Sequence, residues 1–170
     1  YYDVVETPLG WMGLLASPRG LRRTTLPRRS PDETIQMLGP GITDAKLDAR
    51  PFDRLRQRLV RYLSGVVETF ADEPIDVDNA PILSRAAWTA CRAIPFGETR
   101  TYGWLAAQAG RAHAPRAAGQ TMARNRLPIV IPCHRVIASD GSLGGFGRGT
   151  SQLGLKQRLL DIEREACGAQ

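Results

Sequence analysis

Cysteine and histidine are scarce in this chain of 170 residues, which contains three cysteines and two histidines. Cys91, Cys133 and Cys167 are far apart and form no Cys-Xaa-Xaa-Cys pair. An odd number of widely spaced cysteines argues against a disulfide scaffold and against a zinc site, so we expect no metal and no cofactor. Free thiols are typical of a reducing compartment, and we therefore expect a cytoplasmic protein.

Long hydrophobic runs are also missing. No stretch approaches the roughly 20 apolar residues that a membrane span requires. The first ten residues, YYDVVETPLG, lack the basic and then apolar pattern of a signal peptide. With 42% hydrophobic and 24% charged residues, the composition is typical of a globular protein with no membrane association.

Acidic residues are depleted in one half of the chain. Residues 1–79 contain 11 Lys and Arg against 12 Asp and Glu, whereas residues 80–170 contain 12 against 5. Six arginines and no acidic residue lie between Glu98 and Asp140. A basic half indicates a polyanionic partner such as nucleic acid. A GC-rich genome would also produce 21 arginines beside 2 lysines, so charge alone leaves both interpretations open.

The first half predicts a small sheet with helices. Residues 1–26 combine short apolar runs with Pro-Leu-Gly and Pro-Arg-Gly turns, which is typical of an antiparallel meander. Ser30 and Pro31 predict the start of a helix. A second helix is predicted over residues 51–65, with arginines opposite its apolar stripe and Gly65 at its end. The stripe consists of Phe52, Leu55, Leu59, Tyr62 and Leu63.

The acidic, proline-containing segment 71–81 predicts a linker between two domains, residues 1–78 and 79–170. A helix should follow it, with Ser84 as a plausible cap and an apolar face that starts near its first turn. That face is predicted to contain Ile82, Ala86, Trp88 and Ala90.

Two short helices come next, one from about Thr101 to Gly110 and one over residues 115–125. A tight turn joins them, and the second is rich in Arg, Ala and Gly, which is a weak helix-turn-helix pattern because many helix pairs bind nothing. An amphipathic helix over residues 153–166 completes the chain.

The stretch IVIPCHRVIAS, residues 129–139, carries the chemistry. Its apolar runs predict a buried strand, yet Cys133, His134 and Arg135 interrupt them, and buried titratable groups are costly. The two basic neighbours would lower the pKa of a thiol. An inert, buried cysteine is the alternative interpretation.

His134 can act on Cys133 only under a geometric condition. Adjacent residues of a regular strand point to opposite faces, so the chain must turn here or a water must bridge the two groups. A carboxylate behind the imidazole would keep it basic and oriented. The candidates are Glu163, Asp161 and Glu165, all within the last helix.

Three stretches together resemble the O6-alkylguanine-DNA alkyltransferases, the methylated-DNA–protein-cysteine methyltransferase family. They read IPFGETRTYGWLAAQAG, RAAGQTMARNRLPIVIPCHRVIASDGSLGGFGRG and LKQRLLDIE, and the similarity is strongest over residues 80–165. The resemblance implies an α/β (α+β) fold. A small N-terminal sheet-plus-helix domain, similar to RNase H, would precede a mainly helical C-terminal domain with a helix-turn-helix and an active-site loop.

The resemblance also implies a mechanism. Cys133 would accept the alkyl group irreversibly from O6-alkylguanine, and from O4-alkylthymine, in a single turnover. His134, acting through a water and held by Glu163, would take the thiol proton. Tyr102 would donate a proton to the guanine as it leaves. Asn125 matches the asparagine that ties together the turns beside the cysteine.

The implied partner is double-stranded DNA containing the lesion, bound through the minor groove by a monomer, with cooperative binding left open. The target base must leave the helical stack. Arg116 resembles the residue that takes its place, although a phosphate contact is the alternative. The implied DNA-binding residues are Arg116, Ala117, Ala118, Gly119, Arg124 and Arg135. The implied base-pocket residues are Tyr102, Val136, Phe146, Gly147 and Arg148.

Two departures from the family pattern concern the pocket. Arg148 occupies a position where a glycine is usual, and Phe146 one where a tyrosine is common, so the preferred alkyl group stays open. Two other functions also remain: a non-catalytic module that binds alkylated DNA, similar to alkyltransferase-like proteins, and a Cys-His hydrolase or acyltransferase.

Overall fold

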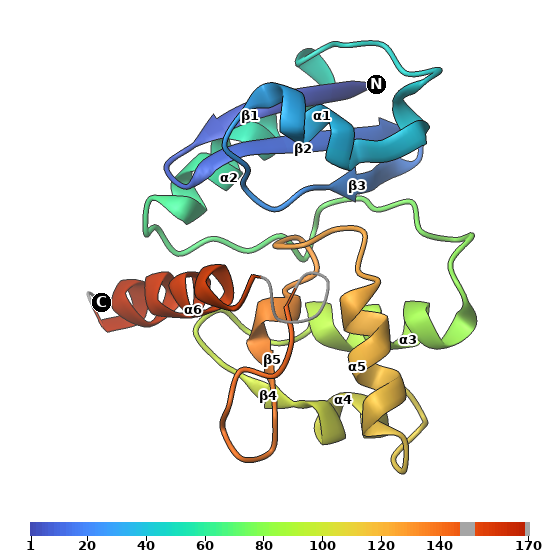
Figure 1. Ribbon diagram of the computed structural model, residues 1–170, viewed down its shortest axis with the longest axis vertical. Helices are drawn as coiled ribbons and strands as arrows, with labels where there is room; N and C mark the ends of the chain where they lie inside the picture. Colours follow the sequence, from blue (N-terminus) through green and yellow to red (C-terminus); the bar gives the residue numbers. More distant parts are fainter. Residues whose placement is uncertain (147–151, 169–170) are drawn as a thin grey trace. The chain divides into compact units, whose positions relative to one another are not determined.

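The computed structural model describes residues 1–146 and 152–168, which form two units (Figure 1). The chain changes from the first unit to the second between Asp76 and Val77, beside the predicted limits of 1–78 and 79–170. Each unit also contains at least one short segment that is flanked in the sequence by residues of the other unit. The first unit consists of Tyr1–Glu68, Asp72–Asp76 and Arg126–Pro128, and the second of Thr69–Ala71, Val77–Asn125 and Ile129–Gln170.

The sheet of the first unit is the predicted antiparallel meander. Its strands are β1 (Tyr2–Thr7), β2 (Gly10–Ser17) and β3 (Gly20–Thr24), in the order β1-β2-β3. The central strand β2 is buried on both faces because a helix covers each of them.

The two helices α1 (Pro31–Leu38) and α2 (Asp53–Leu63) lie on opposite faces of this sheet (Figure 1). Gly13 of β2 faces α1, where an added Cβ would lie 2.8 Å from Leu38 Cγ. Asp3 pairs in register with Leu14, the next residue of β2, and so points to the other face, where it binds Arg56 of α2 at 3.3 Å.

The predicted helix ends of this unit are confirmed. Ser30 Oγ accepts a hydrogen bond from the Glu33 amide at 3.2 Å, and Pro31 occupies the first position of α1. Gly65, with φ +91°, follows the end of α2. Short 3₁₀ turns η1 (Gly39–Ile42) and η2 (Arg50–Phe52) connect the two helices.

The prediction that the α2 arginines lie opposite the apolar stripe is wrong for Arg58. Its side chain is buried, because its guanidinium binds Glu68, Asp72 and Glu73 of the following segment.

The second unit contains the predicted helix pair. Helix α4 (Tyr102–Gln108) begins at its cap Thr101, and α5 (Pro115–Ala123) begins with its proline. Both pack on α3 (Ile82–Arg92), where Trp88 Nε1 donates to the Thr121 carbonyl of α5 at 2.9 Å. Helix α6 (Leu153–Gly168) ends the described chain.

The predicted start of α3 is wrong. Pro81 is the N-cap residue, whereas Ser84 is buried inside the helix. Ile82 is 79% exposed, because the buried face of α3 runs through Ala87, Trp88 and Cys91.

The predicted strand at residues 129–139 is also corrected. This segment is buried as expected, but it forms a 3₁₀ turn, η3 (Cys133–Arg135), followed by the short strand β5 (Val136–Ile137). Strand β5 pairs in parallel with β4 (Arg100–Thr101). Within residues 1–146 and 152–168, no helix combines the length and apolar character that crossing a membrane demands.

Candidate active site

The turn η3 places Cys133 and His134 on one tight bend, which meets the geometric condition that the sequence imposed. The Cys133 amide donates to the Ile131 carbonyl at 2.7 Å, and the Arg135 amide donates to the Pro132 carbonyl at 2.9 Å. Asn125, two residues beyond α5, donates from Nδ2 to the Ile131 carbonyl at 2.9 Å. The asparagine therefore joins the end of α5 to the cysteine turn.

A buried carboxylate lies behind His134, and of the three candidates it is Glu163. His134 Nε2 hydrogen bonds to Glu163 Oε2, and both side chains are almost completely buried. Glu163 Oε1 accepts from Arg135 Nε at 2.8 Å and from the Gly97 amide at 2.9 Å. Asp161 binds Arg164 instead, at 2.6 Å, and Glu165 is exposed.

These contacts fix the protonation of the pair. Burial raises the pKa of Glu163, but the hydrogen bond from His134 and the charge of Arg135 outweigh it and lower the pKa to about 2. Burial lowers the pKa of His134 below its usual 6.5, although the hydrogen bond and the charge of Glu163 act in the opposite direction; the charges of Arg135 and Lys156 add to the effect of burial. At neutral pH a neutral imidazole therefore donates to a carboxylate, and it keeps the capacity to take a proton.

The predicted effect on the Cys133 thiol is corrected. Burial raises its pKa, although a hydrogen bond with Asn125 and the charge of Lys156 act in the opposite direction. The charge of Arg135 cannot dominate here, because its guanidinium is bound to the Glu163 carboxylate. A thiol with a raised pKa needs a base before it can attack, and His134 is the adjacent residue in the same turn.

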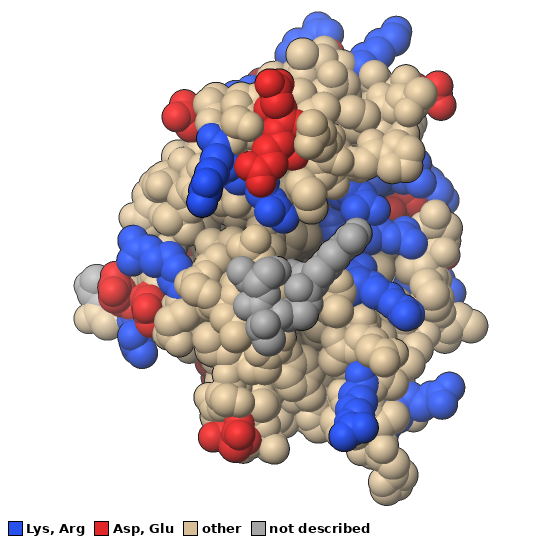
Figure 2. Space-filling model, in the orientation of Figure 1, with Lys and Arg blue, Asp and Glu red and all other residues tan. Residues whose placement is uncertain are grey.

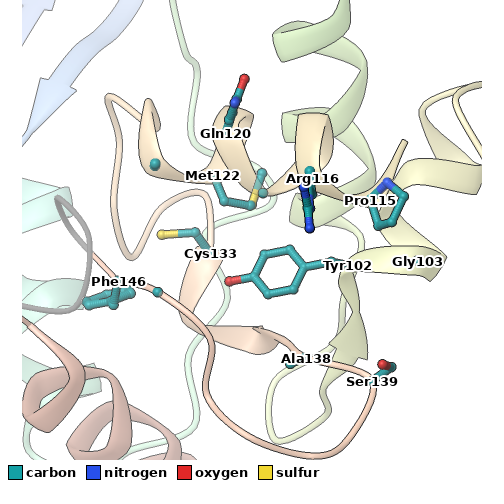
Figure 3. Close-up of a pocket in the computed structure, with 13 residues that line it drawn as sticks. Tyr102, Gly103, Pro115, Arg116, Gln120, Met122, Cys133, Ala138, Ser139 and Phe146 are labelled. Atoms are coloured by element: carbon teal, nitrogen blue, oxygen red, sulfur yellow. The ribbon is translucent and has the colours of Figure 1, made fainter. Parts of the chain in front are cut away.

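Cys133 opens on a cavity of about 840 Å³ (Figure 3). Tyr102 crosses this cavity with its hydroxyl on the side of Cys133 and Phe146, while Arg116 and Gln120 line it from α5. The other lining residues are Gly103, Pro115, Gly119, Met122, Ala123, Ala138, Ser139 and Gly145. The cavity thus joins the thiol to the helix that the sequence predicts for DNA binding.

Glycines on two sides confine the Tyr102 ring. A Cβ on Gly119 of α5 would be in ordinary contact with the ring, at 3.7 Å from Cδ1. A Cβ on Gly144, where φ is +71°, would lie only 2.9 Å from Cε2. The phenol is therefore confined between α5 and the glycine-rich loop that contains Gly141, Gly144 and Gly145.

Lys156 is a site residue that the sequence analysis missed. It lies in the first turns of α6, its side chain is 0% exposed, and Nζ donates to the carbonyls of Val136, Leu143 and Gly145. The only available signal was its place seven residues before Glu163 on an amphipathic helix, where both residues share a face. Lysine on such a helix is usually solvated, so this signal was weak.

Three predicted binding residues lie elsewhere than expected. Arg135 is buried against Glu163 and the Ile94 carbonyl, which leaves it unable to reach DNA. Ala118 is only 2% exposed, on a helix that packs against both α3 and α4. Val136 is buried behind the cavity wall, and its carbonyl accepts from Lys156.

The remaining predicted residues divide into two groups. Arg116 and Arg124 are exposed and Ala117 is half-buried, as contact with DNA requires. Figure 2 shows Lys and Arg side chains over α4 and α5, in the part of the sequence that contains no acidic residue. Gly147 and Arg148 lie outside the described residues. In the described part of the chain, no group of three or more His, Cys, Asp and Glu side chains is arranged to hold a metal.

Comparison with known proteins agrees with this geometry. Residues 83–165 match the family model described as 6-O-methylguanine DNA methyltransferase, DNA binding domain. The methylated-DNA–protein-cysteine methyltransferase of Methanosarcina barkeri is 36% identical over 96% of both chains. The chain belongs to the methylated-DNA–protein-cysteine methyltransferase family.

Other members of the methylated-DNA–protein-cysteine methyltransferase family give the same result. The constitutive enzyme of Bacillus subtilis is 34% identical over 96% of this chain and 95% of its own. A crystal structure of Mycobacterium tuberculosis OGT in complex with DNA has a TM-score of 0.79 at 30% identity, and covers 97% of this chain and 93% of that chain. The similarity includes both units, so the α/β fold predicted from the sequence is confirmed.

Proposed function

We propose that this protein repairs DNA by moving an alkyl group from O6 of guanine, and from O4 of thymine, to Cys133. The observation that carries the proposal is the position of this thiol, which borders a cavity beside α5 while a buried His134–Glu163 pair stands behind it. Membership of the methyltransferase family supports the same reaction. The products are a thioether on the protein and an intact base, so one molecule repairs one lesion.

The arrangement of the site supports the following proton transfers. His134 takes the thiol proton through a bridging water, and Glu163 stabilises the imidazolium that results. The thiolate attacks the alkyl carbon, an S–C bond forms, and the C–O bond breaks with its electron pair on guanine. Tyr102, whose pKa is raised by burial and so retains its proton, donates to the departing base.

Access to the lesion requires that the nucleotide rotate out of the duplex, since the cavity wall carries the thiol. Arg116 is exposed and lines the cavity, so we assign it the space that the base vacates. Ala117 and Gly119 present little side chain on the same helix, which favours a close approach of α5 to the minor groove. We propose a monomer, in a reducing cytoplasm that keeps the thiol free.

The test is the intact mass of the protein after incubation with duplex DNA that contains O6-methylguanine. We expect one added methyl group on Cys133 in the wild type and none in Cys133→Ser. Binding selective for the lesion without a mass change would replace this proposal with a non-catalytic binding module. A transient acyl adduct with ester substrates would indicate a Cys-His hydrolase.

A further inference from the structure

Two polar side chains lie on the face of α5 that borders the cavity. Arg116 and Gln120 are separated by one helical turn, so they share a face and are offset by about 6 Å along the helix axis. Both side chains are exposed. The other α5 residues that line the cavity carry no hydrogen-bonding side chain, and they are Pro115, Gly119, Met122 and Ala123. A molecule that approaches this face therefore meets one charged and one neutral polar group.

The side-chain amide of Gln120 is available to a ligand. Among the residues that the structure describes, none forms a hydrogen bond with its oxygen or nitrogen, and only its backbone carbonyl is used, by the Arg124 amide at 3.1 Å. Thr121, the third polar residue of α5, is buried instead, and its hydroxyl donates to the Ala118 carbonyl at 2.6 Å. The fold of this unit therefore does not need the Gln120 amide.

Figure 3 shows the direction of this amide, which extends away from Cys133 and Tyr102. A base rotated into the cavity would lie beside Cys133 and Tyr102, so Gln120 is directed towards the DNA that remains stacked. In the proposed complex α5 approaches the minor groove, where successive base pairs are about 3.4 Å apart. An offset of about 6 Å from Arg116 then corresponds to one or two base pairs from the lesion.

The minor groove presents different hydrogen-bonding groups at the two kinds of base pair. An A·T pair has only acceptors, N3 of adenine and O2 of thymine, whereas a G·C pair adds the N2 amino group of guanine, which donates. A guanidinium only donates, so Arg116 cannot accept from this amino group. A glutamine amide does both, so Gln120 can accept from guanine N2 while it donates to guanine N3.

We propose that Gln120 is a specificity-determining residue, which favours repair of a lesion that has a G·C pair one or two positions away on one side. This inference rests on the proposed function and adds a preference for DNA sequence to it. Beside an A·T pair, the carbonyl oxygen of Gln120 would lose its water and gain no donor, which is costly. Gly119 and Ala123 are small, so they allow the groove to come within reach of this side chain.

The experiment measures single-turnover rate constants for methyl transfer to Cys133, at protein concentrations below saturation, from short duplexes with one O6-methylguanine. One G·C pair is placed in turn at each of the four positions within two base pairs of the lesion, in flanks otherwise of A·T. The guanine of that pair is then replaced by inosine, which lacks the N2 amino group and pairs with the same cytosine. At one position, the wild type should react about tenfold faster with guanine than with inosine, as a bidentate contact would produce.

Matched variants assign this preference to Gln120. Gln120→Leu has a similar size without hydrogen-bonding groups, so it should reduce the ratio of the two rates to about one, with thermal unfolding close to wild type because the side chain is exposed. Gln57→Leu makes the same change at an exposed position of α2 in the first unit and should retain the ratio. Equal rates with guanine and inosine at all four positions, or an unchanged ratio in Gln120→Leu, would overturn the proposal. A wild type that forms no methyl-Cys133 with any duplex would instead refute the proposed function.

Discussion

Gly144 shows how the conformation of one residue shapes the candidate site. Its φ of +71° lies in the left-handed region, and an added Cβ would be 2.9 Å from Cε2 of Tyr102 and 3.0 Å from its hydroxyl oxygen. Real Cβ atoms do not approach so closely, so the phenol or the loop would have to move. The glycine is therefore required twice, for its backbone angle and for the space that it leaves.

We predict that Gly144→Ala lowers the free energy of unfolding by about 1–3 kcal/mol through backbone strain, and also slows transfer by displacing Tyr102. Gly141→Ala is the matched control, because Gly141 has φ +85° with no atom near its Cβ position. Chemical denaturation and single-turnover rates should show similar stability losses, with slow transfer confined to Gly144→Ala. Equal rates for the two variants would mean that the position of Tyr102 is unimportant.

At the scale of single residues, the sequence indicated which side chains form the candidate site better than it indicated how they are buried and what they contact. The motif around Cys133 pointed to the thiol and its imidazole, and the last helix offered three carboxylates, of which the structure places Glu163 against His134. The sequence did not predict that Lys156 is buried or that Arg135 is enclosed. Both depend on which carbonyls and carboxylates lie beside the side chain, and those belong to segments distant in the chain.

At the scale of elements, α2 is tied to the segment that follows it by one buried arginine. Arg58 binds Glu68 at 3.2 Å, Asp72 at 2.7 Å and Glu73 at 3.1 Å. These carboxylates lie in the segment just after the helix, and this segment has no regular secondary structure. The ion pairs of the Arg58 guanidinium therefore hold this irregular segment against α2.

We predict that Arg58→Met destabilises the protein by about 3–5 kcal/mol, because it leaves three carboxylates without their buried partner. Arg54→Met, one turn earlier on α2, removes an exposed contact to Asp72 and should cost less than about 1 kcal/mol. Urea denaturation of both variants would measure the difference. Similar losses would show that the network contributes through exposed charges alone.

The ends of helices were predicted correctly where neighbouring residues determine them. The conformation of a segment was predicted wrongly where contacts with distant residues determine it. Capping by Ser30 and termination by Gly65 depend on neighbouring residues, and both were predictable. The segment after Ile129 has strand-like composition, yet Ile129 itself adopts φ +76° and a 3₁₀ turn follows. Hydrogen bonds from Asn125 and from the Cys133 amide to the Ile131 carbonyl hold that turn.

At the scale of the whole molecule, basic and acidic residues are distributed unevenly along the chain. Residues 80–170 contain 12 basic and 5 acidic residues, a surplus of seven basic residues, whereas residues 1–79 are nearly balanced. Each cation that contacts a phosphate releases condensed counterions, so affinity falls steeply as salt rises. The same pattern predicted a polyanionic partner from the sequence, although it could not distinguish a repair enzyme from a simple binder.

The slope of log affinity against log salt is negative. We predict that its magnitude falls by about one for Arg124→Ala, if this exposed residue contacts one phosphate. Arg54→Met, in the balanced half, should leave the slope unchanged. Fluorescence anisotropy with undamaged duplex DNA at several salt concentrations would measure both. An unchanged slope for Arg124→Ala would remove this residue from the DNA contacts.

The segment Arg126–Pro128, which belongs to the first unit although its neighbours in the sequence belong to the second, has a consequence for how such a protein can evolve. It belongs to the first unit, where the Thr24 amide donates to the Arg126 carbonyl at 2.9 Å and Thr24 Oγ1 to the Pro128 carbonyl at 2.9 Å. Yet it lies between Asn125 and Ile129, inside the stretch that leads to Cys133. A single recombination event between Asp76 and Val77 would graft a foreign first half onto residues that it does not fit. The two halves of this gene are therefore expected to be inherited and exchanged together.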